Sequence, residues 1–398
     1  MPKNRSSAVP AALPKGGVQA RAALLRSADL HQTGTAMKFT LRRASLLGLL
    51  NLLSGHGLAH ADAPQLYGRL NLGIEDMRLQ GVGRETSVRM SNYRSVFGVR
   101  GSEALGGDLR VVYQVEGTLS PDSGAGAVAA RDTRVGLAGR WGTLFAGNWT
   151  TPYTSSSAAL DPFYPTTAGY MSIMGNGSAA SADNASDTTS FDRRQRNSLH
   201  YWTPAWKGLS LRLARGLNEE TPAGGARPAL SSGVLLFERG PLYAALAAER
   251  HHDYRGPGLD DHGLKLAAAW QFGTVKLGGA VERLHYETAS GKLERMAYYL
   301  SLTRQMGAHG LRLGVAKARD GKGGSRERVG FIAAGSGTGA LHATLGYDYA
   351  LSKRSSLFAF YTRLRNDSRG TADFAINGLD GPPGATASGA ALGMRHAF

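Results

Sequence analysis

The sequence contains no cysteine, no apolar run long enough for a membrane-spanning helix and no tract rich in lysine or arginine. The first absence excludes disulfide scaffolds, cysteine nucleophiles and thiolate metal sites. The second argues against helical anchoring, which needs about 20 consecutive apolar residues. The third argues against nucleic-acid binding, although 46 Lys and Arg stand against 30 Asp and Glu.

Glycine, in contrast, is abundant. The 398 residues include 54 glycines, roughly twice the usual share of ~7%, and each glycine weakens a helix by about 1 kcal/mol. The apolar share of 42% is too high for a disordered chain. Together with 15 tyrosines, this composition predicts a long protein built from sheets and turns.

A candidate export signal follows Met37. Three basic residues come first, then an apolar stretch at 46–53, then the Ala-His-Ala pattern of residues 59–61 that a signal peptidase accepts. We therefore expect export and cleavage before Asp62. The predicted division of the chain is an over-extended or disordered N-terminus at 1–36, a signal peptide at 37–61 and the mature domain at 62–398.

Apolar and polar residues alternate from Leu66 onward. In the segment 66–74, one parity is Leu, Gly, Leu, Leu, Ile and the other is Tyr, Arg, Asn, Gly. A strand sends alternate side chains to opposite faces, so each strand has one apolar face and one polar face. A soluble sandwich and a membrane barrel both show this alternation, and it leaves the two folds open.

The spacing of the turns separates these two folds. We predict about sixteen strands of roughly 8–13 residues between residue 66 and the C-terminus, close to the ~9–11 residues of a membrane strand. Their connections alternate between short turns, such as Gly240-Pro241, and long loops, such as 76–92, 150–195 and 287–293. One rim of tight turns and one of long loops is typical of an outer-membrane barrel, and an even strand number lets the sheet close without an open edge.

Several segments carry a resemblance to a known family. They are LYGRL at 66–70, SVFGVRGSEALGG at 95–107, VGL at 135–137 with GTLFAG at 142–147, RNSLHYWTP at 196–204 and YDYALSKRSSL at 347–357. Together with the terminal Phe398, they resemble the general diffusion porins of Gram-negative bacteria, specifically the betaproteobacterial subfamily. Two positions depart from that subfamily, which often has arginine where this chain has Asn148-Trp149 and His200.

The resemblance implies an all-β fold: a transmembrane antiparallel β-barrel of about 16 strands whose third long loop, here 150–195, folds inward. It implies a porin of the outer membrane, exported through the periplasm, that forms a water-filled channel for passive diffusion of small hydrophilic solutes and ions. The implied partners are two further copies of the chain in a homotrimer, outer-membrane lipids with lipopolysaccharide, and the barrel-assembly machinery, which would recognise Phe398.

Strand parity assigns side chains to the lumen. If Leu66 and Leu70 face lipid, then Arg69 faces the lumen, and the same test can be applied to every strand. Bases predicted to face inward outnumber acids: Arg69, Arg100, Arg110, Arg134, Arg212, Lys265, Lys276, Arg295, Arg312 and Arg395 against Glu75, Glu116, Glu249, Glu282 and Asp348.

The predicted functional site is a basic wall that faces an acidic loop. The wall consists of Arg69, Arg100, Arg110 and Arg134. The loop has no Lys or Arg between residues 151 and 191, and its predicted constriction acids are Asp161, Asp183, Asp187 and Asp192. The balance predicts a weak to moderate preference for anions, while wall arginines held in ion pairs remain the structural alternative.

Three other functions compete with a diffusion pore. His251-His252 and Asp253 lie near Asp260-Asp261-His262, which suggests a metal site, but we expect this segment to be a solvated external loop. No nucleophile elbow or zinc-helix motif is present, so we predict no catalytic residue, no metal, no cofactor and no enzyme. A substrate-specific channel with a solute-binding site is the alternative function, and an outer-membrane barrel enzyme ranks behind it.

Overall fold

The computed structural model describes residues 63–80, 85–220, 222 and 224–398. The predicted N-terminal segment 1–36 and the signal peptide 37–61 lie outside the described residues. None of the helices in the described part of the chain is long and apolar enough to cross a membrane.

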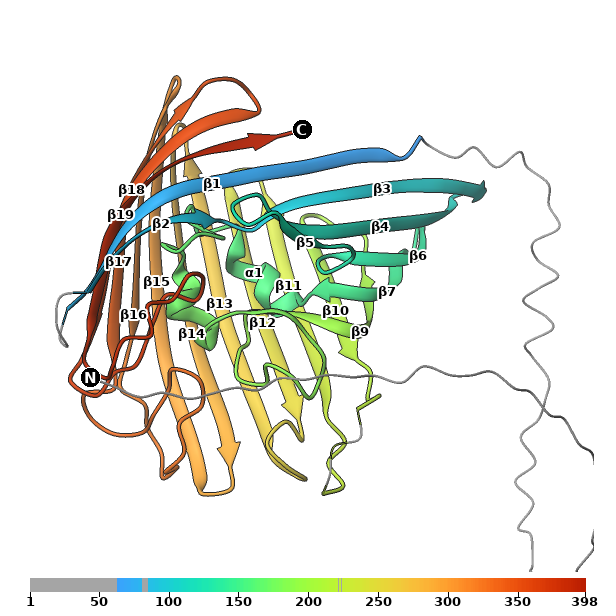
Figure 1. Cartoon of the computed structure of the whole chain (residues 1–398). Helices are drawn as coiled ribbons and strands as arrows, with labels where there is room; N and C mark the ends of the chain where they lie inside the picture. The colour runs from blue at the N-terminus through green and yellow to red at the C-terminus, as the bar shows by residue number, and fades with distance from the viewer. Residues whose placement is uncertain (1–62, 81–84, 221, 223) are drawn as a thin grey trace, which may run out of the picture. The chain divides into compact units, whose positions relative to one another are not determined.

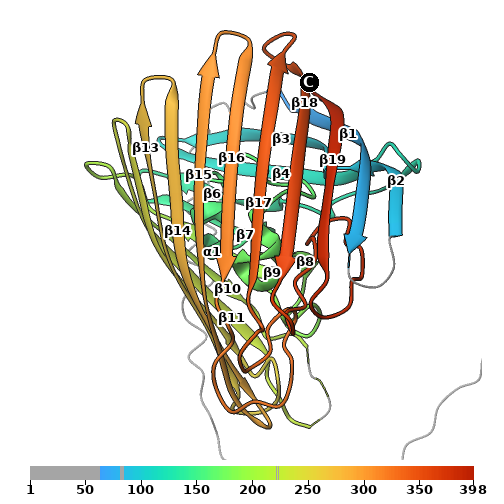
Figure 2. The same cartoon turned by 90° about the vertical axis from the view of Figure 1, so that its left-hand side faces the viewer.

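Sixteen long strands of the described chain form one closed antiparallel barrel, as predicted, and the last of them pairs with the first (Figures 1 and 2). They are β1 (Gln65–Gln80), β3 (Ser95–Gly106), β4 (Leu109–Ser120), β6 (Thr133–Gly139), β7 (Gly142–Thr150), β9 (Arg193–Trp202), β10 (Leu209–Gly216), β11 (Ala229–Arg239), β12 (Leu242–His252), β13 (Asp260–Phe272), β14 (Val275–Thr288), β15 (Gly291–Met306), β16 (His309–Ala318), β17 (Ala340–Ala350), β18 (Ser355–Asn366) and β19 (Thr386–Ala397). Closure leaves no open sheet edge, which a lipid environment requires.

The alternation of the sequence is the alternation of the two barrel faces. Leu66 and Ile74 on β1 expose 56% and 59% of their surface, whereas Asn71 and Glu75 on the same strand expose 3% and 0%. On β13, Leu264 exposes 53% of its surface, whereas the next residue, Lys265, exposes 2%. The exposed leucines form the apolar outer surface that faces lipid, and the polar set forms the inner surface.

Two connections that we predicted as long loops, 76–92 and 287–293, are mostly strand. The strand β1 continues to Gln80, and a short strand β2 (Glu85–Asn92) folds back along it. At 287–293, β14 and β15 are joined by only two residues, and Glu287 pairs across the hairpin with Lys292 at 3.8 Å. Both predictions were wrong because these strands extend beyond the apolar zone of the membrane, where their side chains are polar and the sequence resembles that of a loop.

The two ends of the barrel domain meet at Gly68 and Phe398. Their backbones exchange hydrogen bonds of 3.0 and 3.1 Å, one in each direction. A Cβ on Gly68 would lie 2.3 Å from the Phe398 ring, so only glycine lets the terminal ring lie against β1 at this point. The C-terminal residue therefore seals the seam between β1 and β19.

The connection between β7 and β9 contains most of the non-strand structure. It includes helix α1 (Pro152–Ala158), two short helical turns, η2 (Tyr170–Ser172) and η3 (Met174–Asn176), and the short strand β8 (Ala179–Ala182). A further short strand, β5 (Ala125–Ala127), lies between β4 and β6. Buried Tyr153, Tyr170 and Met171 of this connection join the main apolar core with inner-face residues of β11–β16.

Candidate functional site

The segment 151–192 is hydrogen-bonded to one side of the inner surface, the covered wall, which consists of the inner faces of β11–β17. Glu282 on β14 accepts hydrogen bonds from the Tyr153 hydroxyl at 2.9 Å and from the Gly175 backbone N–H at 2.7 Å. Basic side chains of the covered wall donate to backbone carbonyls of the segment: Arg295 to Ile173 (2.5 Å), Arg312 to Pro162 (2.7 Å) and Lys276 to Ala159 (3.2 Å).

Lys265 shows what this covering does to a charged side chain. It is 2% exposed, its Nζ lies 3.4 Å from Glu282, and the same atom lies 3.9 Å from the centre of the Tyr153 ring. A buried charge is tolerated only when it is paired and hydrogen-bonded. The bases of the covered wall therefore anchor the segment and are not available to a passing ion.

A second set of bases lies on the other side of α1. We call this set the arginine wall, and it consists of Arg69 on β1, Arg94 after β2, Arg131 before β6, Arg134 on β6, Arg194 on β9 and Arg212 on β10. Only two of these guanidinium groups are held by acids: Arg131 by Glu116 at 2.8 Å and Arg194 by Asp132 at 2.7 Å. Among the described residues, no carboxylate lies within ion-pair distance of the other four arginines.

A cavity of about 280 Å³ lies between the arginine wall and α1. Arg131, Arg194 and Arg212 line one side of it together with Trp149 and Trp202. Asp132 also lines this side, where its carboxylate is paired with Arg194, so the bases outnumber the acid. The helix α1 contributes only small or uncharged residues to the other side, because its sequence is Pro-Tyr-Thr-Ser-Ser-Ser-Ala. The cavity is consequently positive on one side and neutral on the other.

Two of the predicted wall residues, Arg69 and Arg134, belong to the arginine wall. Arg69 donates a hydrogen bond to the Arg94 carbonyl at 3.2 Å. Arg134 has no hydrogen-bond partner for its buried Nε and Nη1 among the described residues, and its guanidinium instead lies against aromatic rings. The distances from its Cζ to the ring centres are 4.7 Å for Phe145, 4.4 Å for Trp149 and 5.2 Å for Trp202.

The other two predicted wall residues, Arg100 and Arg110, lie outside this group. Arg100 donates to the side chain of Gln65 at 2.9 Å and stacks on Tyr67, with 5.0 Å between Cζ and the ring centre. Arg110 is exposed at the start of β4, directly after the short turn from β3. The structure thus separates the four predicted arginines into two that belong to the arginine wall, neither of which lines the cavity, and two nearer the rim of short turns.

Of the four predicted constriction acids, Asp161 and Asp192 are buried inside the segment. Asp161 accepts hydrogen bonds from the Phe163 and Tyr170 backbone N–H groups and from the Tyr299 hydroxyl, at 3.0, 2.7 and 2.7 Å. Burial raises the pKa of Asp161 to about 6 and also raises the pKa of Asp192. Both carboxyl groups stabilise the fold of the segment, and neither lines the cavity.

The remaining two acids also lie away from the cavity. Asp183 accepts hydrogen bonds from the backbone N–H groups of Ala185 and Ser186, and although burial acts to raise its pKa, these bonds lower it. Asp187 is exposed and has a positive φ of 46°. The four acids of the segment, which we expected to lie opposite the wall arginines, therefore do not line the cavity.

Sequence analysis missed Arg94 and Arg131 as members of the arginine wall. Both lie near the start of a predicted strand, and we did not predict an inward face for either; in the structure they precede β3 and β6. A useful signal was available for Arg131, because it stands directly beside Asp132 at the entry of a predicted strand that contains Arg134. A charged residue at the entry of a strand can thus face the lumen as one within a strand does.

The expected solvated loop around His251 is partly wrong. His251 and Asp261 are fully buried, and the His251 ring is stacked between Phe191 and Tyr254 at centroid distances of 4.1 and 4.5 Å. Its Nε2 lies 2.9 Å from Glu249. Inner-face packing explains the burial, and the described part of the chain contains no group of three or more residues arranged to hold a metal.

The closed barrel with a polar, partly blocked interior defines the class of protein: a transmembrane β-barrel channel. Residues 49–369 match the model of the Gram-negative porin family, and the chain belongs to this family. It is therefore an outer-membrane porin, a channel for passive diffusion, and its family and fold are those of a channel rather than of an enzyme.

Relatives of known sequence or structure cover most of the chain. The outer membrane porin protein 32 of Delftia acidovorans is 27% identical over 318 residues, which are 76% of this chain and 84% of the relative. An outer membrane porin protein of Bordetella pertussis is 25% identical and covers 84% of this chain and 98% of its own length. The solved structure of an anion-selective porin from Comamonas acidovorans has a TM-score of 0.71 at 23% identity and covers 85% of this chain and 100% of its own.

Proposed function

We propose that this porin is a general diffusion channel that prefers anions. The observation that carries the proposal is the arginine wall, in which Arg69, Arg94, Arg134 and Arg212 have no carboxylate partner among the described residues. The helix α1 opposite them is uncharged. Fields act over about 8 Å at physiological salt, a distance comparable with a pore radius, so unpaired wall charges act on every passing ion.

We also propose that the segment 151–192 is the constriction of the pore. Its support is the set of hydrogen bonds that join it to inner-face residues of β14, β15 and β16, some 100 or more residues away in sequence. Contacts of α1 with β11, β12 and β13 extend this attachment. A segment held in this way narrows the lumen between itself and the arginine wall.

The reversal potential of the purified porin in a KCl gradient across a planar bilayer tests the anion preference. We expect the sign of an anion-selective pore and a preference that weakens as the salt concentration rises, because screening shortens the range of the wall charges. A clear cation preference would refute the proposal. The solved relative described as anion-selective agrees with the expected sign.

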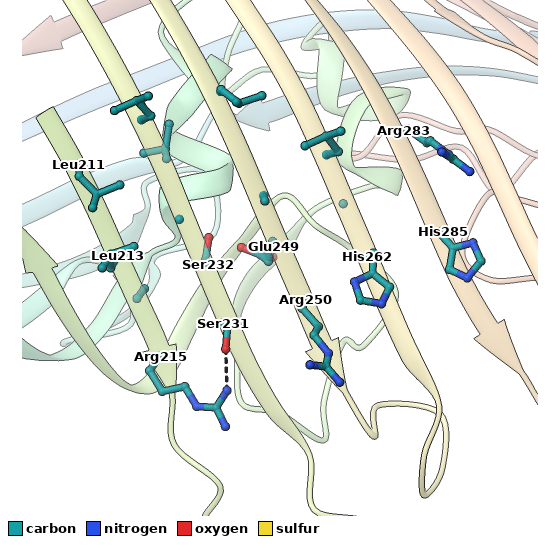
Figure 3. A pocket seen from close by; sticks show the side chains of 18 residues that line it. Leu211, Leu213, Arg215, Ser231, Ser232, Glu249, Arg250, His262, Arg283 and His285 are labelled. Atoms are coloured by element: carbon teal, nitrogen blue, oxygen red, sulfur yellow. Dashed lines mark hydrogen bonds between the residues drawn. The ribbon is translucent and has the colours of Figure 1, made fainter. Parts of the chain in front are cut away.

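We further propose that lipopolysaccharide contacts an outer-surface groove of about 950 Å³ across β10–β14 (Figure 3). Leucines of the lipid-facing parity line one end of the groove, and Figure 3 shows Arg215, Arg250, His262, Arg283 and His285 gathered at the other. Acyl chains fit the leucine end. At the other end Arg250 and Arg283 are paired with Asp260 and Glu294, so Arg215, which has no carboxylate partner among the described residues, is the arginine left for a phosphate group. Co-purified lipopolysaccharide should fall in an Arg215→Gln/Arg250→Gln variant, and unchanged retention would refute this contact.

The remaining proposals concern assembly. We propose a homotrimer, and a solved structural relative, an OmpT of Vibrio cholerae described in a trimer form, supports it at a TM-score of 0.59. Native mass measurement that finds only monomers would overturn it. We also propose that Phe398 is recognised by the barrel-assembly machinery, so that its deletion lowers the amount of folded porin in the outer membrane; normal amounts would contradict the proposal.

A further inference from the structure

We propose that the cavity between α1 and the arginine wall is a binding site for aromatic carboxylates. It is a weak site within the diffusion pore, and it rests on the proposed anion preference. The site combines flat aromatic surfaces, the guanidinium group of Arg212, which has no acidic partner among the described residues, and a neutral opposite side. These three features suit a planar ring that carries a carboxylate, of which benzoate is the simplest probe.

The aromatic surface consists of Trp149 and Trp202, which both line the cavity. Their ring centres lie 5.9 Å apart at an interplanar angle of 67°, and Phe145 meets Trp202 edge-on at 5.0 Å. Aromatic rings attract one another most in such edge-to-face or offset arrangements. A ligand ring that enters the cavity can therefore extend an existing cluster of three aromatic rings.

Arg134 holds this cluster in place. Its guanidinium lies within 5.2 Å of the centres of all three rings, and its Nε and Nη1 have no hydrogen-bond partner among the described residues. A cation over the face of an aromatic ring is stabilising, most of all for tryptophan. The rings consequently present a fixed surface to the cavity, and a ligand loses little free energy in ordering them.

Arg212 supplies the charge that a carboxylate needs. Its Cζ lies 4.8 Å from the centre of the Trp202 ring, and it lines the cavity. Its donors have no acidic partner among the described residues, whereas the neighbouring Arg194 is held by Asp132 at 2.7 Å. An arginine fork matches a carboxylate with two parallel hydrogen bonds. A ring stacked on the tryptophans brings its carboxylate to this fork.

The dimensions suit a single small aromatic anion. The cavity has about 280 Å³, and an apolar cavity of about 150 Å³ is large enough for benzene. The remaining space accommodates the carboxylate and water. Ser155 and Ala158 of α1 close the opposite side without charge, so the site remains weak, as conduction requires.

Competition between matched anions tests the site. Chloride current through single channels is measured while benzoate or cyclohexanecarboxylate, which has the same charge and a similar size but no aromatic ring, is added. Stacking predicts that benzoate reduces the current at a concentration roughly two- to tenfold lower than cyclohexanecarboxylate does. Equal potency of the two anions in the parent porin would overturn the proposal.

Substitutions of Trp202 then test whether the advantage of benzoate arises at the cavity. Trp202→Leu should remove the advantage of benzoate over cyclohexanecarboxylate, and Trp202→Phe should retain most of it. Trp270→Leu is the matched control, because Trp270 lies on the outer surface and is 41% exposed. An unchanged benzoate advantage in Trp202→Leu, with the control also unchanged, would place the binding elsewhere and refute the site.

Failure of the site and failure of the anion preference give different results. If the reversal potential shows anion preference but benzoate has no advantage, only the aromatic site is wrong. If the reversal potential shows cation preference, the proposed function is wrong whatever benzoate does. Heat-dependent mobility of each variant in detergent gels shows that its barrel has folded.

Discussion

The covered wall and the arginine wall carry the same kind of residue and use it differently. On the covered wall, Lys265 and Arg295 are 2% and 4% exposed and are bound to Glu282 and to the Ile173 carbonyl. On the arginine wall, Arg134 and Arg212 lie against aromatic rings and have no carboxylate within ion-pair distance among the described residues. The difference arises because the segment 151–192 covers one side of the inner surface and supplies backbone carbonyl acceptors to its bases, whereas four arginines of the other side have no carboxylate partner among the described residues.

This comparison shows that strand parity predicts which charged side chains face inward but not which of them are paired. Acids illustrate the point equally well: Glu75 accepts hydrogen bonds from Ser91, Tyr93 and Thr167 and an ion pair from Arg89. A carboxylate with that many donors contributes little field to the lumen. The charges that act on the cavity are therefore those of its own lining, in which Arg131, Arg194 and Arg212 outnumber Asp132.

The largest expected effect is the loss of the covered wall's main anchor. Glu282→Ala removes the acceptor for Tyr153 and Gly175 and leaves Lys265 buried without a partner, so we expect a destabilisation of about 3–5 kcal/mol. Single-channel conductance should rise as the segment loosens. Glu238→Ala, at an exposed glutamate of β11 that forms no ion pair among the described residues, is the control. A thermal midpoint of Glu282→Ala equal to that of the parent would contradict the anchoring role.

The next effect is a pH dependence that belongs to the segment itself. Burial raises the pKa of Asp161 to about 6, so the folded chain retains a proton that the unfolded chain releases above about pH 4. This stabilisation, on the order of 3 kcal/mol, is fully present below pH 4 and is lost as the pH rises through about 6.

Thermal unfolding of the porin at several pH values measures this contribution. The parent should gain stability between pH 7.5 and pH 4.5 relative to Asp161→Asn, in which the group no longer titrates. Asp187→Asn, at an exposed acid of the same segment, should behave like the parent. Parallel pH profiles for the parent and Asp161→Asn would show that the carboxyl group does not respond to burial in this way.

A smaller effect is expected for selectivity. Neutralising two arginines of the arginine wall, in Arg69→Gln/Arg212→Gln, should lower the chloride-to-potassium permeability ratio several-fold, since each charge contributes on the order of 1 kcal/mol at close range. Reversal potentials in a KCl gradient measure the change. Arg215→Gln on the outer surface is the control, and a ratio that stays at the parent's value would show that the two arginines are structural.

The smallest effect is expected at the rim of short turns. Arg110→Gln removes an exposed charge that lies apart from the cavity, and salt screens such a charge over about 8 Å. We expect its reversal potential to stay close to that of the parent at physiological salt. A shift as large as that of the double variant would place the selectivity-determining region at the rim rather than at α1.

The sequence predicted the barrel because the barrel depends on local alternation. All sixteen strands were anticipated, since a leucine such as Leu66 facing lipid and a polar residue such as Asn71 facing inward leave a period of two in the chain. The family resemblance is confirmed by the match over residues 49–369. The hairpin at 287–293 was missed because its strands carry charged residues past the membrane zone.

The candidate site was less predictable because it depends on contacts distant in sequence. Nothing near Asp161 indicates that Tyr299 donates a hydrogen bond to it, and that contact helps to turn a supposed pore charge into a buried carboxyl. Nothing near Arg134 indicates that Trp202 lies beside it. Parity placed Arg134 on the correct face, but the rings around it came together only when β6, β7 and β9 paired.

The seam between β1 and β19 also has a consequence for the order of folding. Gly68 and Phe398 exchange backbone hydrogen bonds although they stand at opposite ends of the barrel domain. Closing so long a loop has a high entropic cost and slows the step that needs it. The contact that completes the barrel thus joins two residues that are far apart in the chain. A variant without Phe398 loses both closing hydrogen bonds and leaves this end of β1 unpaired on its β19 side.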